Sequence, residues 1–224
     1  MDQDESKDDT TQTTFFDPDR NCWRVRQAER LALIVDGADY LAALRQVIGQ
    51  ARRELLLIGW DFDFEIEMLP GESDDDGNAP DGLPNQVGPF LEAVVEQSPD
   101  LHVHILKWNG AVVAAPGRLL STAAVYVFSH DRIHLALDGH HPFGACHHQK
   151  IIVADTSFAF CGGIDVTENR WDTSDHTPGD PRRVDKDGDL LGPWHDATTA
   201  MTAPSLNRLA TLPGRGGCAP PGRP

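Results

Sequence analysis

A histidine, a lysine and an aspartate stand at a spacing that suits chemistry on phosphorus. His148 and Lys150 are two residues apart, an apolar stretch, Ile151–Ala154, follows them, and Asp155 comes next. Because side chains two apart on a strand leave the same face, we expect the imidazole and the ammonium to enter one pocket. A neutral imidazole can attack or carry a proton, and an ammonium can hold a phosphate oxygen. The pair therefore suits attack on a phosphodiester.

A glycine pair, Gly162 and Gly163, completes the pattern after the next expected strand. His-x-Lys-x4-Asp followed by two glycines resembles the signature of the phospholipase D superfamily, with every spacing met. The resemblance covers roughly residues 21–200. It includes segments similar to the opening of these proteins and to the stretch after their first motif, namely Asn21–Trp23, Leu33–Gly37, Ile58–Asp63, Asn169–Asp172 and Pro193–Asp196.

The resemblance implies a covalent mechanism. In the family, two motif copies meet across an approximate two-fold axis; one histidine attacks phosphorus and the other protonates the leaving group, then activates water or an alcohol. His148 would be the nucleophile that forms the phosphohistidine, and Lys150 would hold the nonbridging oxygens. Asp155 joins the catalytic set, although its place at the strand end better suits bracing of the turn. The scheme requires no metal and no cofactor.

Other residues near the motif are candidates for substrate contact. Asp165 lies three residues after Gly162, where nucleases of the family place an asparagine, and this pattern is more similar to the phospholipid-cleaving branch. An ionised acid cannot donate a hydrogen bond to phosphate, so Asp165 is expected beside the site or orienting a histidine. Gly162, Gly163 and Arg170 are the remaining candidates, and a structural ion pair is the competing interpretation for Arg170.

Histidines are concentrated before the motif. Six of the ten lie between His130 and His148, next to Cys146. A metal site there is disfavoured, because Cys146, His147 and His148 are consecutive and lack the spacing of zinc ligands. His176 and His195 stay undecided between a structural and a functional role, with the structural role favoured. We expect no bound metal.

Charge and composition restrict the partners. The net charge is −16, and residues 197–224 contain three arginines and no acid, so the negative charge lies on the rest of the chain. Nucleic-acid binders gather basic surface, so nucleic acid is disfavoured as a substrate. Scattered cysteines argue against a disulfide framework and fit a reducing compartment. With no apolar run long enough to cross a bilayer, we expect a cytoplasmic protein that meets lipid peripherally at the membrane.

Periodicity predicts an α/β fold with a mixed, largely parallel central sheet flanked by helices. Helices are expected over 38–53 and 87–97, with a weaker pattern at 116–124, and loops over 70–86 and 173–192. Strands are expected over 54–60, 101–108, 132–138, 150–154 and 158–162.

The organisation suggests one folded unit between two polar ends. Residues 1–20 are acidic and aperiodic, residues 21–200 form the phospholipase D-like first half, and residues 201–224 are rich in proline and glycine and are expected to be disordered. A single motif implies a second half-site, from a homodimer or a separate chain, for hydrolysis or transphosphatidylation of phospholipid. The competing hypothesis is a truncated, catalytically silent remnant that binds a partner, with a frameshift as one source of the tail.

Overall fold

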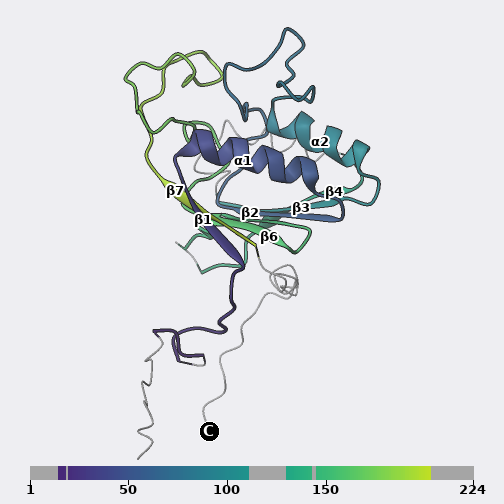
Figure 1. The fold of residues 1–224 in the computed structure, drawn as a ribbon, viewed down its shortest axis with the longest axis vertical. Helices are drawn as coiled ribbons and strands as arrows, with labels where there is room; N and C mark the ends of the chain where they lie inside the picture. The colour runs from purple at the N-terminus through teal and green to yellow at the C-terminus, as the bar shows by residue number, and fades with distance from the viewer. Residues whose placement is uncertain (1–14, 19, 111–129, 143–144, 203–224) are drawn as a thin grey trace, which may run out of the picture.

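A mixed β-sheet with two helices on one face forms the folded part of the chain (Figure 1). This computed structural model describes residues 15–18, 20–110, 130–142 and 145–202. Seven strands lie in the order β1-β7-β6-β5-β2-β3-β4. Their bounds are Arg30–Val35 (β1), Glu54–Gly59 (β2), His102–Trp108 (β3), Ile133–Asp138 (β4), Ile151–Ala154 (β5), Phe158–Gly162 (β6) and Ala197–Thr202 (β7). The α/β class and the mixed sheet are thereby confirmed.

Most strand pairs in this sheet are antiparallel, so the expectation of a largely parallel sheet was wrong. Only β2–β3 and β3–β4 are parallel among the described strands, whereas β1–β7, β7–β6, β6–β5 and β5–β2 are antiparallel. The physical reason is the short turn after Ala154, which folds β6 back beside β5 as a hairpin. In β7, residues that the apolar pattern did not single out pair with both β6 and β1.

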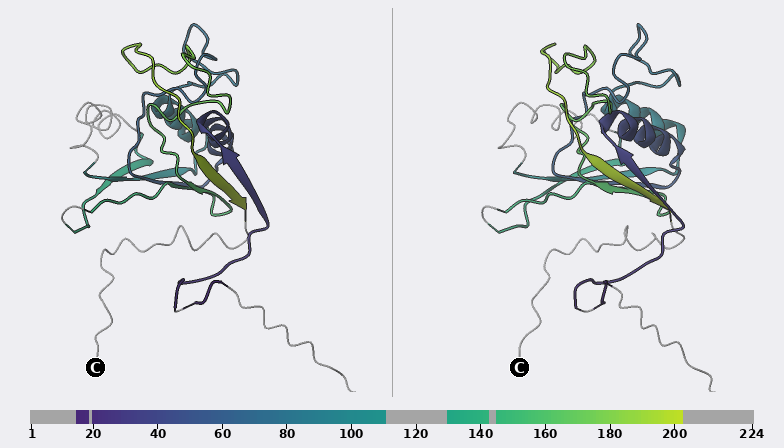
Figure 2. Two further views of the ribbon diagram at one scale, coloured as in Figure 1. Left: turned by 90° about the vertical axis from the view of Figure 1, so that its left-hand side faces the viewer. Right: turned by 60° about the vertical axis from the view of Figure 1, so that its left-hand side comes forward.

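Helices α1 (Gly37–Gln50) and α2 (Val87–Gln97) lie side by side on the same face of the sheet (Figures 1 and 2). In α1, Leu41, Leu44 and Ile48 are spaced three and four apart and are all buried. They share one core with Leu55 and Leu57 of β2, because every second residue of a strand faces the helices. The predicted helices are confirmed, α2 with its bounds unchanged.

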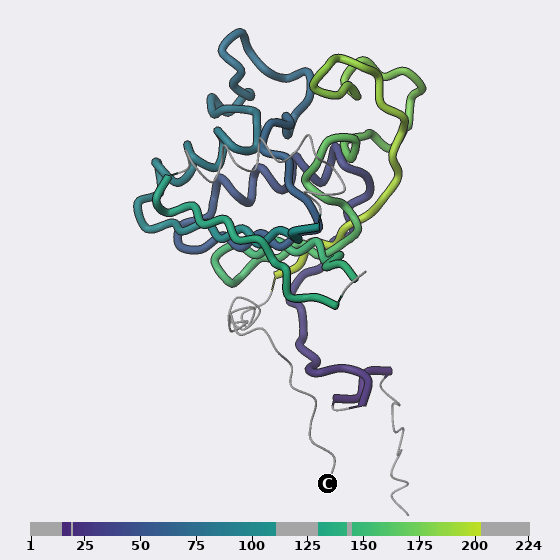
Figure 3. The backbone as a smooth tube through the Cα atoms, turned by 180° about the vertical axis from the view of Figure 1, so that it is seen from behind, coloured from purple at the N-terminus to yellow at the C-terminus, as the bar shows by residue number. Residues whose placement is uncertain are grey.

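Two long connections, residues 60–86 and 163–196, lie side by side beyond the helices (Figure 3). Arg45 of α1 holds the connection 60–86 in place. Its guanidinium donates hydrogen bonds to both carboxylate oxygens of Asp81 and to the backbone carbonyls of Leu83 and Pro84. These connections begin at the edge of the sheet that carries the motif residues. The helix expected over 116–124 falls outside the described residues.

Candidate active site

The motif residues lie where three parallel strands end. Ile151, the first residue of β5, pairs with Ile58 near the end of β2, and the ends of β3 and β4 are next along the same edge. His148 and Lys150 therefore precede β5 at the carboxyl ends of β2–β4, the edge of an α/β sheet at which ligands usually bind. His148 is exposed and Lys150 is buried, and the ammonium of Lys150 lies 3.4 Å from the carbonyl oxygen of His148.

Lys150 is paired with an acid rather than free. Its Nζ lies 3.0 Å from Oδ2 of Asp165, and the two side chains are 6% and 4% exposed. Burial raises the pKa of Asp165, while the hydrogen bond and charge of Lys150 and the charge of Arg170 oppose that rise. Asp165 is therefore a neighbour of Lys150. Of the two roles expected from the sequence, a place beside the site and the orientation of a histidine, this contact corresponds to the first. Among the described residues, the other Asp165 oxygen, Oδ1, is buried without a hydrogen-bond partner.

The space beside this pair is small. The cavity that borders Lys150 and Asp165 has a volume of about 10 Å³, the space of one water probe at most. Tyr40 also lines this cavity, and burial together with the charge of Asp165 raises the pKa of its hydroxyl, which therefore stays protonated. Lys150 is buried, whereas His148, whose backbone carbonyl its ammonium contacts, is exposed.

Asp155 lies at the far end of β5 from Lys150. Its carboxylate accepts hydrogen bonds from the backbone N–H groups of Arg52, Arg53 and Glu54, at 2.8–3.1 Å. These donors form the turn between α1 and β2. The structure thus places Asp155 as a brace of that turn, the alternative that its position at the strand end suggested.

The two glycines of the motif stand where the backbone has no room for a side chain. A Cβ on Gly162 would lie 2.4 Å from the backbone of Thr198, and one on Gly163 would lie 2.2 Å from the carboxylate of Asp196. Gly163 also donates its N–H to the carbonyl of Ala197. Both glycines permit the close approach of β7 to the end of β6.

Arg170 lies over an indole. Its guanidinium carbon is 4.0 Å from the centre of the Trp194 ring, and it donates to the Asn169 side chain. Its charge also lowers the pKa of Asp165. Arg170 therefore contributes positive potential to the side of the site on which Asp165 lies.

The exposed His148 belongs to an aromatic cluster. The other members are Trp60, Trp108, His141 and His147. Trp60 meets the His148 ring edge-on, with centres 6.3 Å apart, and stacks on Trp108 at 5.8 Å. The indole N–H of Trp108 donates to Nε2 of His141, whose ring meets that of His147. Neither Trp108 nor His141 was singled out by sequence analysis. One feature of the sequence could have indicated this cluster: Trp60 and Trp108 each stand at the end of a predicted strand.

His147 is held by an acid of the neighbouring strand. Its Nδ1 lies 2.6 Å from Asp138, the last residue of β4. Burial raises the pKa of Asp138, but the His140 backbone N–H and the His147 ring outweigh it, so the net pKa is lowered and Asp138 is ionised near neutral pH. The adjacent His148 is exposed, and its ring contacts that of Trp60.

A second buried ion pair lies next to Trp60 in the sequence. Asp61, which follows Trp60, binds the ammonium of Lys107 on β3, and both side chains are fully buried. A paired charge is retained in the core because removing either partner would leave the other uncompensated. The pair joins the segment that follows β2 to β3.

Comparisons with known proteins agree with this geometry. No family model matches the chain. Over 84% of its length the chain is 24% identical to phospholipase D B of Dictyostelium discoideum, and over 79% it is 24% identical to a phospholipase D of Phytophthora infestans. The curated relatives that match this chain over most of its length are phospholipases D, which supports the phospholipase D superfamily. The match spans 17% and 12% of those two relatives, so this phospholipase D-like chain corresponds to less than a fifth of either.

The solved structure of NucT from Helicobacter pylori shows the same fold. It superposes with a TM-score of 0.50 and 12% identity, over 81% of this chain and 91% of NucT. The superfamily fold is thus shared at a level where sequence identity is low. In the described part of this phospholipase D-like chain, no helix is long and apolar enough to cross a membrane.

Proposed function

We propose that this chain supplies one half-site of a phospholipase D-type phosphodiesterase that hydrolyses, or transphosphatidylates, phospholipid. The observation that carries the proposal is the placement of exposed His148 beside buried, positively charged Lys150 at the carboxyl ends of three parallel strands. His148 would attack phosphorus and form a phosphohistidine. Lys150 would stabilise negative charge on the nonbridging oxygens.

The chemistry divides one difficult displacement into two steps. In the first step, the imidazole forms a bond to phosphorus while the alkoxide leaves with a proton from a second acid. In the second step, water or an alcohol displaces the imidazole after giving its proton to that same group. Only one His-x-Lys-x4-Asp occurs in these 224 residues, so a second half-site outside them would supply that acid.

Two features support a half-site open to a partner. His148 is exposed and the cavity beside Lys150 is too small for a substrate, so the substrate would lie between this edge and a second one. Lys150 and Arg170 both bring positive charge close to Asp165, which suits an anionic diester despite the acidic chain. A phospholipid headgroup linkage is the substrate class that the named relatives favour.

The test combines turnover with molecular mass. The full chain is assayed on bis(p-nitrophenyl) phosphate and on phosphatidylcholine micelles, and its mass in solution is measured by light scattering. We expect turnover by a dimer, and a fall of about a thousandfold or more in His148→Ala. His140→Ala is the matched control, because that imidazole is 86% exposed on the same edge.

The competing function is a catalytically silent binding domain. The neutralisation of Lys150 by Asp165 favours it, since the lysine already has an anionic partner. A folded monomer without turnover on either substrate would support that function and contradict the half-site. Turnover that survives His148→Ala would contradict the assignment of the nucleophile.

A further inference from the structure

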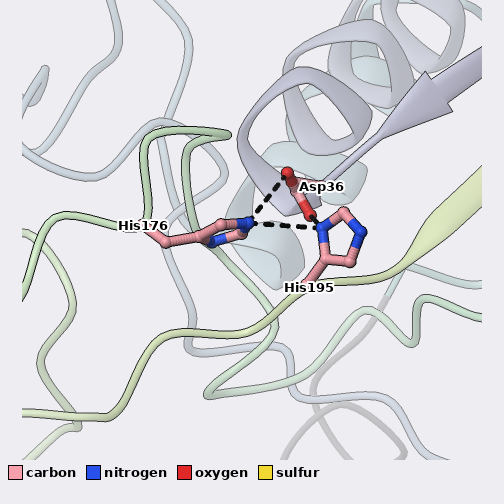
Figure 4. A group of neighbouring side chains, drawn as sticks. All are labelled: Asp36, His176 and His195. Atoms are coloured by element: carbon pink, nitrogen blue, oxygen red, sulfur yellow. Dashed lines mark hydrogen bonds and ion pairs between the residues drawn. The ribbon is translucent and has the colours of Figure 1, made fainter.

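Three potential metal ligands meet at the other end of the same sheet edge. Asp36 directly follows β1, His195 lies just before β7, and His176 comes from the connection 163–196 (Figure 4). Nδ1 of His195 lies 2.8 Å from Oδ1 of Asp36 and 3.2 Å from Nε2 of His176. Nε2 of His176 lies 3.5 Å from Oδ2 of Asp36.

These separations fit donors around one ion. First-row transition metals bind imidazole nitrogen and carboxylate oxygen at about 2.0–2.2 Å. Two such ligands stand about 2.9 Å apart at a right angle and about 3.4 Å apart at a tetrahedral angle, from the same bond lengths. The three distances, 2.8, 3.2 and 3.5 Å, fall within about 0.1 Å of that interval, and the 2.8 Å and 3.5 Å distances end on different oxygens of Asp36. One ligand atom of each residue lies within 4.8 Å of the others, so small rotations of these side chains would place all three about 2 Å from one ion.

Asp36 holds a buried oxygen that the described residues leave unsatisfied. The residue is 1% exposed, and its Oδ2, which faces His176, has no hydrogen-bond partner. Asp36 occupies the cap position of α1 yet makes no side-chain capping bond. Its backbone lies at φ 67° and ψ 161°, a region that residues other than glycine rarely adopt. A cation at this point would satisfy the oxygen and compensate the strained backbone.

His176 is oriented as a metal ligand by an outer carboxylate. Its Nδ1 lies 2.9 Å from Oδ2 of Asp172, so Nδ1–H donates there and the Nε2 lone pair faces Asp36. Asp172 is itself fixed by the guanidinium of Arg183 and by the N–H of Trp194.

From these observations we propose that Asp36, His176 and His195 bind one divalent first-row transition ion, with zinc as the reference metal. Two imidazoles and a carboxylate form a borderline donor set, which disfavours calcium and magnesium. The His195 side chain is 70% exposed, so the fourth position opens to solvent and would hold water. The ion would join the end of β1, the start of β7 and the connection 163–196. Its ligands Asp36 and His195 are 159 residues apart in the sequence.

A second histidine group provides the internal control. The rings of His102, His104 and His134 stack on β3 and β4, with centres 4.9–6.5 Å apart and planes within 22° of parallel. The lone pairs of imidazoles lie in the ring planes, so stacked rings do not aim them at one point. Removing His134 should therefore leave metal binding at the Asp36 group unchanged.

The experiment titrates untagged, chelator-treated full-length chain with Co²⁺, followed by its visible d–d absorption, and then displaces cobalt with Zn²⁺. Bound zinc per chain is counted by elemental analysis after gel filtration. We expect one ion per chain, binding at least a hundredfold weaker in His195→Ala and in His176→Ala, and unchanged binding in His134→Ala. Because His195 is exposed, His195→Ala should fold normally, which far-UV circular dichroism would verify.

The proposal is independent of phosphodiesterase activity, because its readouts are absorption and stoichiometry. Failure of the wild-type chain to bind zinc stoichiometrically at micromolar concentration would overturn it. So would unchanged cobalt spectra in folded His195→Ala, or a loss of binding confined to His134→Ala. If His176→Ala does not fold, His195→Ala and His195→Gln decide the outcome.

Discussion

Lys150 and Asp165 form an ion pair, 3.0 Å between Nζ and Oδ2, in which both side chains are almost wholly buried. The lysine precedes β5 and the aspartate follows β6, so the pair ties the start of one hairpin strand to the segment beyond the other. The same lysine is the proposed phosphate ligand. Its contributions to stability and to catalysis can therefore be separated by substitution.

Removing the lysine should destabilise the fold because it leaves a buried carboxylate uncompensated. We expect Lys150→Met to lower the free energy of unfolding by about 3 kcal/mol, near the lower end for a broken buried pair. The double variant Lys150→Met/Asp165→Leu should recover most of that loss, because no buried charge then remains. Urea unfolding of the three proteins measures both effects. A double variant less stable than Lys150→Met would contradict this account, and turnover should remain lost in both.

The stability of Lys150→Met should depend on pH with a defined sign. Burial raises the pKa of Asp165, and loss of Lys150 removes the main opposing influence. A carboxyl whose folded pKa is above its unfolded value favours folding when protonated, so stability falls as pH rises through that interval. The difference between wild type and Lys150→Met should therefore shrink as pH is lowered from neutrality toward the ordinary value near 3.8. Urea unfolding at stepped pH tests this; a constant difference would contradict it.

Asp155 is expected to stabilise the fold without entering the reaction. Asp155→Ala removes the acceptor of three backbone N–H groups and should cost about 2 kcal/mol in unfolding free energy. Asp155→Asn keeps one acceptor oxygen, and asparagine tolerates the backbone φ of 48°. We therefore expect it to lose less unfolding free energy than Asp155→Ala. Per folded molecule, kcat should stay near wild type for both. A selective fall in kcat in fully folded Asp155→Asn would return this residue to the catalytic set.

The ion pair between Arg45 and Asp81 should anchor the connection 60–86. The Arg45 guanidinium lowers the pKa of Asp81, aided by the Leu83 N–H and against a smaller effect of burial. Asp81→Asn should cost about 1 kcal/mol, because Asp81 is half exposed and solvent screens the pair. That contribution is complete above pH 3.8 and is lost as pH falls through the lowered pKa, so the two proteins should converge in acid. Asp75→Asn, an exposed acid of the same connection, is the control and should show no such convergence.

Local periodicity was sufficient to find most helices and strands. The three- and four-residue spacing of Leu41, Leu44 and Ile48 predicted α1, and the continuous apolar run from Glu54 predicted β2. These features depend on side-chain spacing along a few turns or residues, which the sequence states directly. The motif spacing likewise located His148 and Lys150 at one edge of the sheet.

What the sequence could not supply is the path of the chain between elements. Strand order and direction depend on how distant segments pack, so the prevalence of antiparallel pairs emerged only in the tertiary structure. The same holds for side chains that meet across long separations. Asp36 and His195 are 159 residues apart, and nothing in either local pattern indicates that they touch. Sequence therefore determined the elements and the motif, whereas tertiary packing decided that Lys150 is paired with Asp165 and that two histidines converge on a buried carboxylate.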